Sequence, residues 1–246
     1  MQFLSTFVSL SACLLLPTQI GASPHKADPN PLNQVYIMKQ QIDYSRGFLD
    51  VFGQDGTVVY RFAKNVQDPL QGDSKTVLMT PSLELLSALG STNDICGHKT
   101  TYTEYDLPLS SKKHFTIDPN GLLKDEWTFN FVDRSGKRQN FKFNRNFSSK
   151  EGKIYPQIKG EDGELIAELR DQERTDAFLT TPSVHEVATY TLFCTADSPQ
   201  RTDSWLTTPS VHEVDTYTLS CTEDSPQVEL VMLMGLVLSR VHDCGL

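Results

Sequence analysis

The chain has 246 residues, of which 38% are hydrophobic and 22% charged; this excludes a wholly disordered protein and allows one large domain or two small ones. The formal net charge of −9 argues against nucleic acid as a partner, because contacts to phosphates need a basic surface. The charge is uneven, since residues 112–153 carry ten Lys and Arg but five Asp and Glu.

Residues 1–22 are predicted to be a signal peptide. Leu4–Leu16 is an apolar run of suitable length, Ile20–Ala22 offers a cleavage site with small residues, and the run is short for a transmembrane span. No Lys or Arg precedes it, so a hydrophobic arm on a cytoplasmic protein is the alternative. We favour secretion, with no transmembrane segment after cleavage. Residues 23–34 are then a Pro-rich linker, and residues 35–246 form a single domain.

Cleavage of the signal peptide would leave four cysteines: Cys96, Cys194, Cys221 and Cys244. Four cysteines in an exported chain permit three disulfide connectivities, and their spacing does not choose among them. Cys96-Gly97-His98 has no partner pair at zinc-ligand spacing, so it is interpreted as a loop. Asn146 begins an Asn-Phe-Ser sequon, which is a glycosylation site if the chain is exported.

Four short turn signals divide the middle of the chain into hairpins: Asp55-Gly56, Asn120-Gly121, Ser135-Gly136 and Asp162-Gly163. The flanking residues alternate with a period of two. Trp127, Phe129 and Phe131 share one face of their strand, and Phe141 and Phe143 share one face of the next. Alternation of this kind predicts an antiparallel meander with one buried face, in a sandwich or a barrel. Residues 80–86 interrupt the pattern and predict a short helix or a turn.

A stretch of 27 residues occurs twice in succession, at 174–200 and 201–227, with five differences. Each copy contains one candidate strand, Val187–Cys194 in the first and Val214–Cys221 in the second. A meander needs only one of them, and the second copy is the more polar. We therefore predict that the first copy supplies the core strand and that the second loops out or joins an edge. A recent duplication and an error in the gene model both remain open.

The segment Val228–Leu238 is apolar on almost every side, and such a segment must be enclosed. A buried strand is one interpretation. Its Met and Leu content favours a helix threaded through the β structure.

Four segments together resemble the tubby C-terminal-like fold in its fungal and LURP-one-related branches: YIMKQQIDYSRGFLDVFGQDGTVVYRF, DEWTFNFVDRSGKRQNFKFNR, GKIYPQIKGEDGELIAELR and VELVMLMGLVLSRV. The resemblance covers Val35–Val241. It implies a mainly β fold, in which an antiparallel meander closes as a barrel around a hydrophobic C-terminal helix. It also implies a non-enzymatic binding module without a cofactor, because tubby proteins bind phosphoinositide headgroups through basic residues on the barrel surface. The family is largely intracellular, so a signal peptide departs from its pattern.

The candidate ligand-binding surface is the basic hairpin: Arg134, Lys137, Arg138, Lys142 and Arg145. Clustered Lys and Arg on strands can hold an anionic phospholipid, and a protein is the other expected partner. The alternative is a solvated hairpin whose charges provide solubility and protect the strand edges.

No catalytic or metal signature is present in the chain. His185 and His212 recur in Ser-Val-His-Glu-Val, which lacks the second histidine of a zinc motif, and neither a nucleophile elbow nor a P-loop occurs. The chain is therefore predicted not to be an enzyme. Two alternatives are a secreted fungal effector-like interaction protein and a secreted hydrolase without a recognisable motif.

Overall fold

The computed structural model describes seven ranges of the chain: 31–44, 46–68, 70–105, 112–119, 125–145, 151–180 and 214–244. The predicted signal peptide, residues 23–30 of the predicted linker, Asn146, His185, His212 and Cys194 lie outside these residues.

The described residues form thirteen strands and two helices: β1 (Gln34–Lys39), β2 (Leu49–Gly53), β3 (Val58–Asp68), β4 (Asp73–Met79), β5 (Leu85–Ser91), β6 (Thr100–Glu104), β7 (His114–Pro119), β8 (Asp125–Val132), β9 (Arg138–Arg145), β10 (Gly152–Ile158), β11 (Glu161–Asp162), β12 (Ala167–Arg174), α1 (Ala177–Thr180), β13 (Val214–Cys221) and α3 (Gln227–Cys244).

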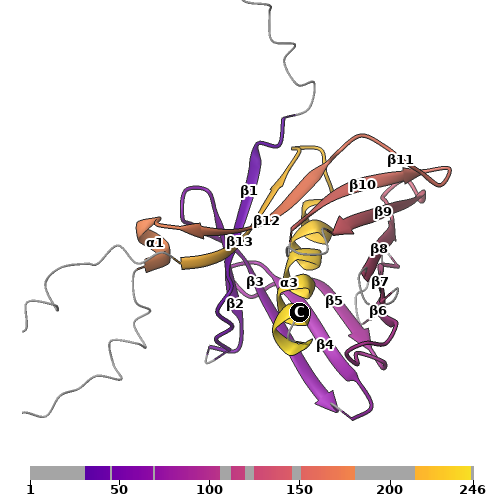
Figure 1. The fold of residues 1–246 in the computed structure, drawn as a ribbon, viewed down its shortest axis with the longest axis horizontal. Coiled ribbons are helices and arrows are strands. Elements are labelled where there is room, and N and C mark those ends of the chain that lie inside the picture. The colour runs from indigo at the N-terminus through magenta and orange to yellow at the C-terminus, as the bar shows by residue number, and fades with distance from the viewer. Residues whose placement is uncertain are drawn as a thin grey trace, which may run out of the picture.

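Twelve of these strands close into one antiparallel barrel (Figure 1). Around the barrel the order is β10-β12-β13-β1-β2-β3-β4-β5-β6-β7-β8-β9. Strand β9 completes the closure by pairing with β10, from Arg145 opposite Gly152 to Phe141 opposite Pro156. Strand β11 adds a two-residue pairing to β10. The predicted antiparallel meander is confirmed, and it closes as a barrel.

The alternating aromatic residues of β8 and β9 point into the barrel, as predicted. Trp127, Phe129 and Phe143 are each 1% exposed. The ring of Phe129 stacks between Phe115 at 5.2 Å and Phe141 at 4.8 Å, measured between ring centroids. The apolar face of each strand therefore contributes to one continuous core, while the intervening polar residues face outwards.

Two predicted turns are confirmed, at Gly56 and Gly136, where φ is +81° and only glycine is free of strain. The predicted turn at Asp162-Gly163 is wrong. The chain turns earlier, at Lys159 and Gly160, with φ of +56° and +86°. Asp162 lies instead in β11, opposite Gln157. The turn between β7 and β8 lies outside the described residues.

Residues 80–86 form a turn and the beginning of β5, not a helix. The Thr80 amide donates to the Glu84 carbonyl at 2.9 Å, and the Leu83 amide donates to the Thr80 carbonyl at 2.9 Å. The Thr80 hydroxyl also accepts from the Glu84 amide at 3.1 Å. These bonds close the turn before a helical turn is complete, and they leave Leu83 with φ of +70°.

Helix α3 lies inside the barrel, which confirms the predicted core helix. Every residue from Leu230 to Val241 is buried, and the helix shares one core cluster with the inward residues of the strands. Figure 1 shows the helix lying among the strands. Gly235 allows the closest approach. A Cβ atom at that position would lie 2.3 Å from the ring of Phe62 on β3, so a side chain there would force the helix away from the wall. The helix fills the interior that the strands enclose.

A buried ion cluster fixes the C-terminal end of α3. Arg240 lies 3.1 Å from Asp94 in the β5–β6 loop, and Lys64 of β3 lies 2.8 Å from both Asp94 and Asp243. Burial would raise the pKa of Asp94. The charge of Lys64 and hydrogen bonds from Lys64, Tyr102 and Ser74 outweigh burial and hold that pKa below its ordinary value. Cations here also complement the negative end of the helix dipole.

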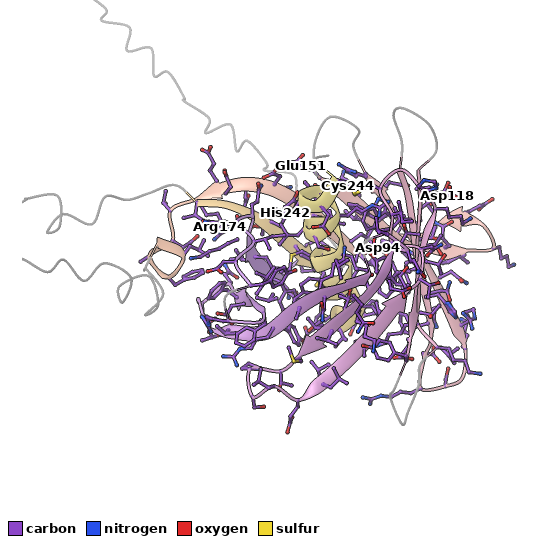
Figure 2. The ribbon with its side chains drawn as sticks, turned by 90° about the horizontal axis from the view of Figure 1, so that it is seen from below. Asp94, Asp118, Glu151, Arg174, His242 and Cys244 are labelled. Carbon is purple, nitrogen blue, oxygen red and sulfur yellow. A yellow bond between two sulfur atoms is a disulfide. The ribbon has the colours of Figure 1, made fainter. Side chains whose placement is uncertain are left out.

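A disulfide joins Cys96 to Cys244 beside this cluster, where Figure 2 shows Asp94 and Cys244 near the end of the helix. This pairing belongs to only one of the three connectivities that the sequence left open, and the second bridge of that connectivity, Cys194–Cys221, is not formed. Cys221 is a buried free thiol. The predicted loop at Cys96-Gly97-His98 is confirmed, and its cysteine ties that loop to α3.

The prediction that the first repeat copy supplies the core strand is wrong. Strand β13 is Val214–Cys221, which belongs to the second copy. It pairs with β12 on one side and with β1 on the other. The polar residues of the second copy, on which that prediction rested, occupy positions that are not buried. Asp215 is exposed and Ser220 is partly exposed. Only residues 222–226 separate β13 from α3, so proximity to the helix outweighs the difference in polarity.

The fold in fact uses parts of both copies. The end of β12 at Arg174 and helix α1 come from the first copy. In α1, Leu179 is buried, and the ring of Phe178 lies 5.5 Å from that of Phe52 on β2. Strand β13 and the first residue of α3 come from the second copy. The described part of the fold therefore takes residues 174–180 from the first copy and residues 214–227 from the second.

Candidate functional site

The turn between β8 and β9 is held by one carboxylate. Asp133 accepts hydrogen bonds from the amide of Ser135 at 2.9 Å, its hydroxyl at 2.6 Å, the amide of Lys137 at 3.0 Å and the side chain of Gln139 at 2.7 Å. The side-chain bonds from Ser135 and Gln139, followed by the Lys137 amide, lower the pKa of Asp133 to about 2. The turn is therefore a fixed platform rather than a loose loop.

Three of the predicted cations sit on this platform. Arg134, Lys137 and Arg138 are exposed, within one turn of each other. Arg138 Nη1 also donates to Asn130 Oδ1 on the neighbouring strand, which orients its guanidinium group. We call these three residues the basic tip.

The other two predicted residues lie apart from the basic tip. Lys142 faces outwards from β9, because Phe141 and Phe143 face inwards, and it is about 13 Å along the strand from Arg138. Arg145 has the same strand parity as the inward residues. Burial, followed by the charge of Asp171, raises the pKa of Tyr217 on β13, and the charge of Arg145 opposes part of that rise. The structure therefore groups three cations, places Lys142 at the margin and separates Arg145.

No recorded ion pair among the described residues includes a member of the basic tip. The adjacent β10–β11 turn carries Lys159, but Glu161 and Asp162 follow it. Ile158 on that turn is 62% exposed. On the β10–β11 side the basic tip therefore borders a turn with two carboxylates, and the positive charge does not continue in that direction.

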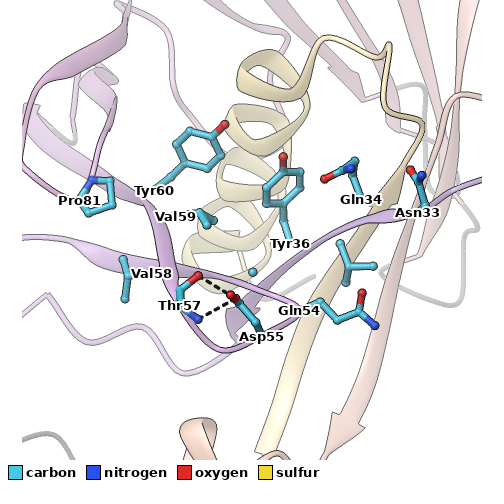
Figure 3. Close-up of a pocket in the computed structure, with 12 residues that line it drawn as sticks. Asn33, Gln34, Tyr36, Gln54, Asp55, Thr57, Val58, Val59, Tyr60 and Pro81 are labelled. Atoms are coloured by element: carbon cyan, nitrogen blue, oxygen red, sulfur yellow. Dashed lines mark hydrogen bonds between the residues drawn. The ribbon is translucent and has the colours of Figure 1, made fainter.

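A pocket of about 590 Å³ lies between the beginnings of β1 and β3 (Figure 3). Two tyrosines border it, with ring centroids 5.7 Å apart and planes inclined at 49°. The hydroxyl of Tyr36 donates to Gln227 Oε1 at 2.5 Å, at the first residue of α3. Burial is the largest cause that raises the pKa of both Tyr36 and Tyr60, so both hydroxyls stay protonated at neutral pH.

Sequence reasoning missed this pocket. Tyr36 and Tyr60 are far apart along the chain and meet only because β2 ends at Gly53, between the strands that carry them. A tyrosine in an alternating strand gives no signal beyond its place on the buried face. The closed β1–β2–β3 register would be needed to find the pair.

Among the described residues, no group of three or more His, Cys, Asp or Glu side chains is placed to hold a metal ion. Within the same residues, none of the helices combines the length and the apolar character needed to span a membrane.

Comparisons of the chain with protein families, with curated proteins and with solved structures found no match.

Proposed function

We propose that this chain is a non-enzymatic binding module of the tubby C-terminal-like fold, and that its basic tip binds an anionic group such as the phosphate of a lipid headgroup. The observation that carries the proposal is the turn held by Asp133. It presents three exposed cations, and none of them forms an ion pair with another described residue. Because the backbone of the turn is fixed in advance, binding a phosphate costs chiefly the freedom of the cationic side chains.

The filled interior supports binding at the surface. Barrels that carry small ligands inside leave a cavity between their strands. Here the helix residues from Leu230 to Val241 are all buried within the core. A closed barrel of twelve strands around a hydrophobic helix is also the plan that the resemblance to the tubby-like fold implies.

We further propose that the protein acts outside the cytoplasm. The disulfide between Cys96 and Cys244 supports this, because disulfides persist in oxidising compartments. In the sequence Asn146 follows the end of β9, whereas the basic tip lies at the beginning of β9. The sequon and the basic tip are therefore separated along the chain by the residues of β9, and a glycan on Asn146 is compatible with binding at the tip.

Sedimentation with vesicles tests the proposal. Vesicles of phosphatidylcholine, with and without a phosphoinositide, would be mixed with wild type and with the Lys137→Glu, Arg138→Glu variant. The matched control is Lys75→Glu, Arg170→Glu, which changes the net charge equally on exposed residues elsewhere on the barrel. We expect the tip variant to lose at least about tenfold in affinity for the phosphoinositide vesicles, and the control to lose much less.

Free inositol trisphosphate separates two sources of the same chemistry. If it competes with the vesicles, the basic tip binds the headgroup phosphate itself. If only the vesicles bind, the basic tip binds the charged membrane surface. Equal binding by wild type and the tip variant, or no binding to either probe, would refute the proposal.

A protein partner is the second candidate function, favoured by one observation. Leu83 has φ of +70°, in a turn closed by Thr80, yet its side chain is 53% exposed. Strain of this kind usually costs 1–3 kcal/mol, and here burial does not offset it. The neighbouring Leu85 is 44% exposed. Two exposed leucines on a rigid turn suit contact with another protein. Loss of a captured partner on Leu83→Ser, Leu85→Ser substitution would be the expected result.

A further inference from the structure

The pocket bordered by Tyr36 and Tyr60, which we call the tyrosine pocket, differs from the basic tip in its charge. Its lining contains no Lys or Arg, and its only acidic residue is Asp55. The Asp55 carboxylate already accepts from the Thr57 hydroxyl at 2.7 Å and the Thr57 amide at 3.0 Å, and these bonds lower its pKa. The pocket therefore offers no cation to an anion, and its one carboxylate is already engaged. An uncharged ligand suits it best.

Three side-chain amides provide the hydrogen-bonding groups of the pocket. Asn33, Gln34 and Gln54 are arranged along one side of it (Figure 3). Among the described residues, no hydrogen bond of these three side chains is recorded. Each amide has two donors and an acceptor oxygen with two lone pairs. A ligand with many hydroxyl groups, each both donor and acceptor, matches this set.

Tyr60, which is partly exposed, and the neighbouring apolar residues supply contact area, and the buried Tyr36 packs beside Tyr60. Tyr36 is 6% exposed and packs in the core, so its ring cannot rotate away. Its bond to Gln227 ties it to the beginning of α3. The remaining apolar lining consists of Val35, Val58, Val59 and Pro81. A fixed aromatic pair beside polar amides is a common design for a site that binds a small ligand with both apolar and polar faces.

The shape of the pocket disfavours an extended peptide. A peptide strand needs a free sheet edge of several residues. On the side of β1 that faces the pocket, pairing with β2 begins at Tyr36, opposite Gly53, so only Gln34 and Val35 remain free there. The volume of about 590 Å³ falls within the range of small-molecule sites. A compact ligand is favoured over a chain that would continue the sheet.

We propose that this pocket binds a neutral carbohydrate. The ring carbons of the sugar would contact Tyr60 and the exposed edge of Tyr36, and its hydroxyls would pair with the amides of Asn33, Gln34 and Gln54. The site lies apart from the basic tip and does not depend on it.

Side-chain amide NMR spectra test this proposal directly, because the three amides are themselves the reporters. The intact chain, with its disulfide formed, would be titrated separately with cellotriose, maltotriose, mannotriose and N-acetylchitotriose. We expect at least one of these sugars to shift the NH₂ signals of Asn33, Gln34 and Gln54 in a saturable manner. The Asn33→Ala, Gln54→Ala variant should raise the dissociation constant at least about tenfold.

The matched control is Asn65→Ala, Asn140→Ala, which removes two exposed amides elsewhere on the barrel and should leave the dissociation constant unchanged. The proposal is overturned if no sugar of the panel shifts these amides, or if the pocket variant and the control bind equally. Shifts produced by triglycine but by no sugar would also overturn it, in favour of a peptide. Vesicle binding at the basic tip reports on a different part of the barrel, so failure of one proposal leaves the other standing.

Discussion

Removal of one repeat copy should leave a folded and more stable protein. Deletion of residues 201–227 joins Gln200 to Val228, so that Val187–Cys194 precedes α3 at the same short distance as β13 does now. The buried residues of β13 are the same in both copies: Thr216, Tyr217, Thr218, Leu219 and Cys221. The new residues within the strand, Ala188 and Phe193, take the positions of Asp215 and Ser220, which are not buried.

The size of the gain follows from the connection between α1 and β13. It falls from about 33 residues to about six, and the entropy of loop closure then predicts a gain of about 1.5 kcal/mol in the free energy of unfolding. Deletion of residues 174–200 instead should gain less. It would place Trp205 at the position of Phe178. The ring of Phe178 already lies so close to Gly56 that a Cβ atom on Gly56 would be 2.6 Å from that ring.

Urea unfolding, followed by tryptophan fluorescence, measures the difference. The chain has two tryptophans, and deletion of residues 201–227 removes Trp205 and leaves the buried Trp127 as a single reporter of the core. Full-length protein carrying Trp205→Phe is the matched control. A deletion variant that unfolds without cooperativity, or that is less stable than the control, would show that the barrel needs more than one copy.

Three further predictions concern residues that determine the stability of the barrel. The Cys96→Ser, Cys244→Ser variant should lose about 2–5 kcal/mol of stability, measured by urea unfolding, because the disulfide closes a long loop. Asp94→Asn should cost about 3–5 kcal/mol, because it leaves two buried cations without their shared carboxylate. Since the pKa of Asp94 is lowered in the folded state, its contribution is present above about pH 4 and lost as the pH falls towards the lowered pKa; the Asn variant should lack that part of the acid sensitivity. Leu83→Gly should raise the melting temperature, because relief of about 1–3 kcal/mol of backbone strain outweighs the roughly 0.5–1 kcal/mol that the greater freedom of glycine in the unfolded chain costs.

Local patterns were sufficient to predict the hairpins and the core helix. The alternation of Trp127 and Phe129 depends on two neighbouring strands, and the turn at Gly136 depends on a dipeptide. The all-round apolar character of α3 is likewise a property of one segment. The turn at Lys159-Gly160 was missed because the short pairing of β11 with β10 decides it, and Asp162-Gly163 has the stronger turn composition.

The parts of the candidate sites that were missed depend on register around the barrel. Arg145 was grouped with the basic tip because the residues are close in sequence, yet strand parity places it on the inward side of β9. The choice between repeat copies depends on the connection to α3, which composition does not reveal. The pocket between Tyr36 and Tyr60 needs three strands in register before the pair exists.

Calorimetric titration with soluble inositol trisphosphate tests the central claim most directly, because it isolates the anionic group from the membrane. Wild type, the Lys137→Glu, Arg138→Glu variant and the Lys75→Glu, Arg170→Glu control would be titrated at low and at high salt. We expect saturable binding by wild type and the control that weakens with salt, and loss of binding in the tip variant. Binding of equal strength in all three proteins would contradict the assignment of the basic tip as the site for an anionic group, and no binding by wild type at low salt would contradict recognition of the headgroup phosphate itself.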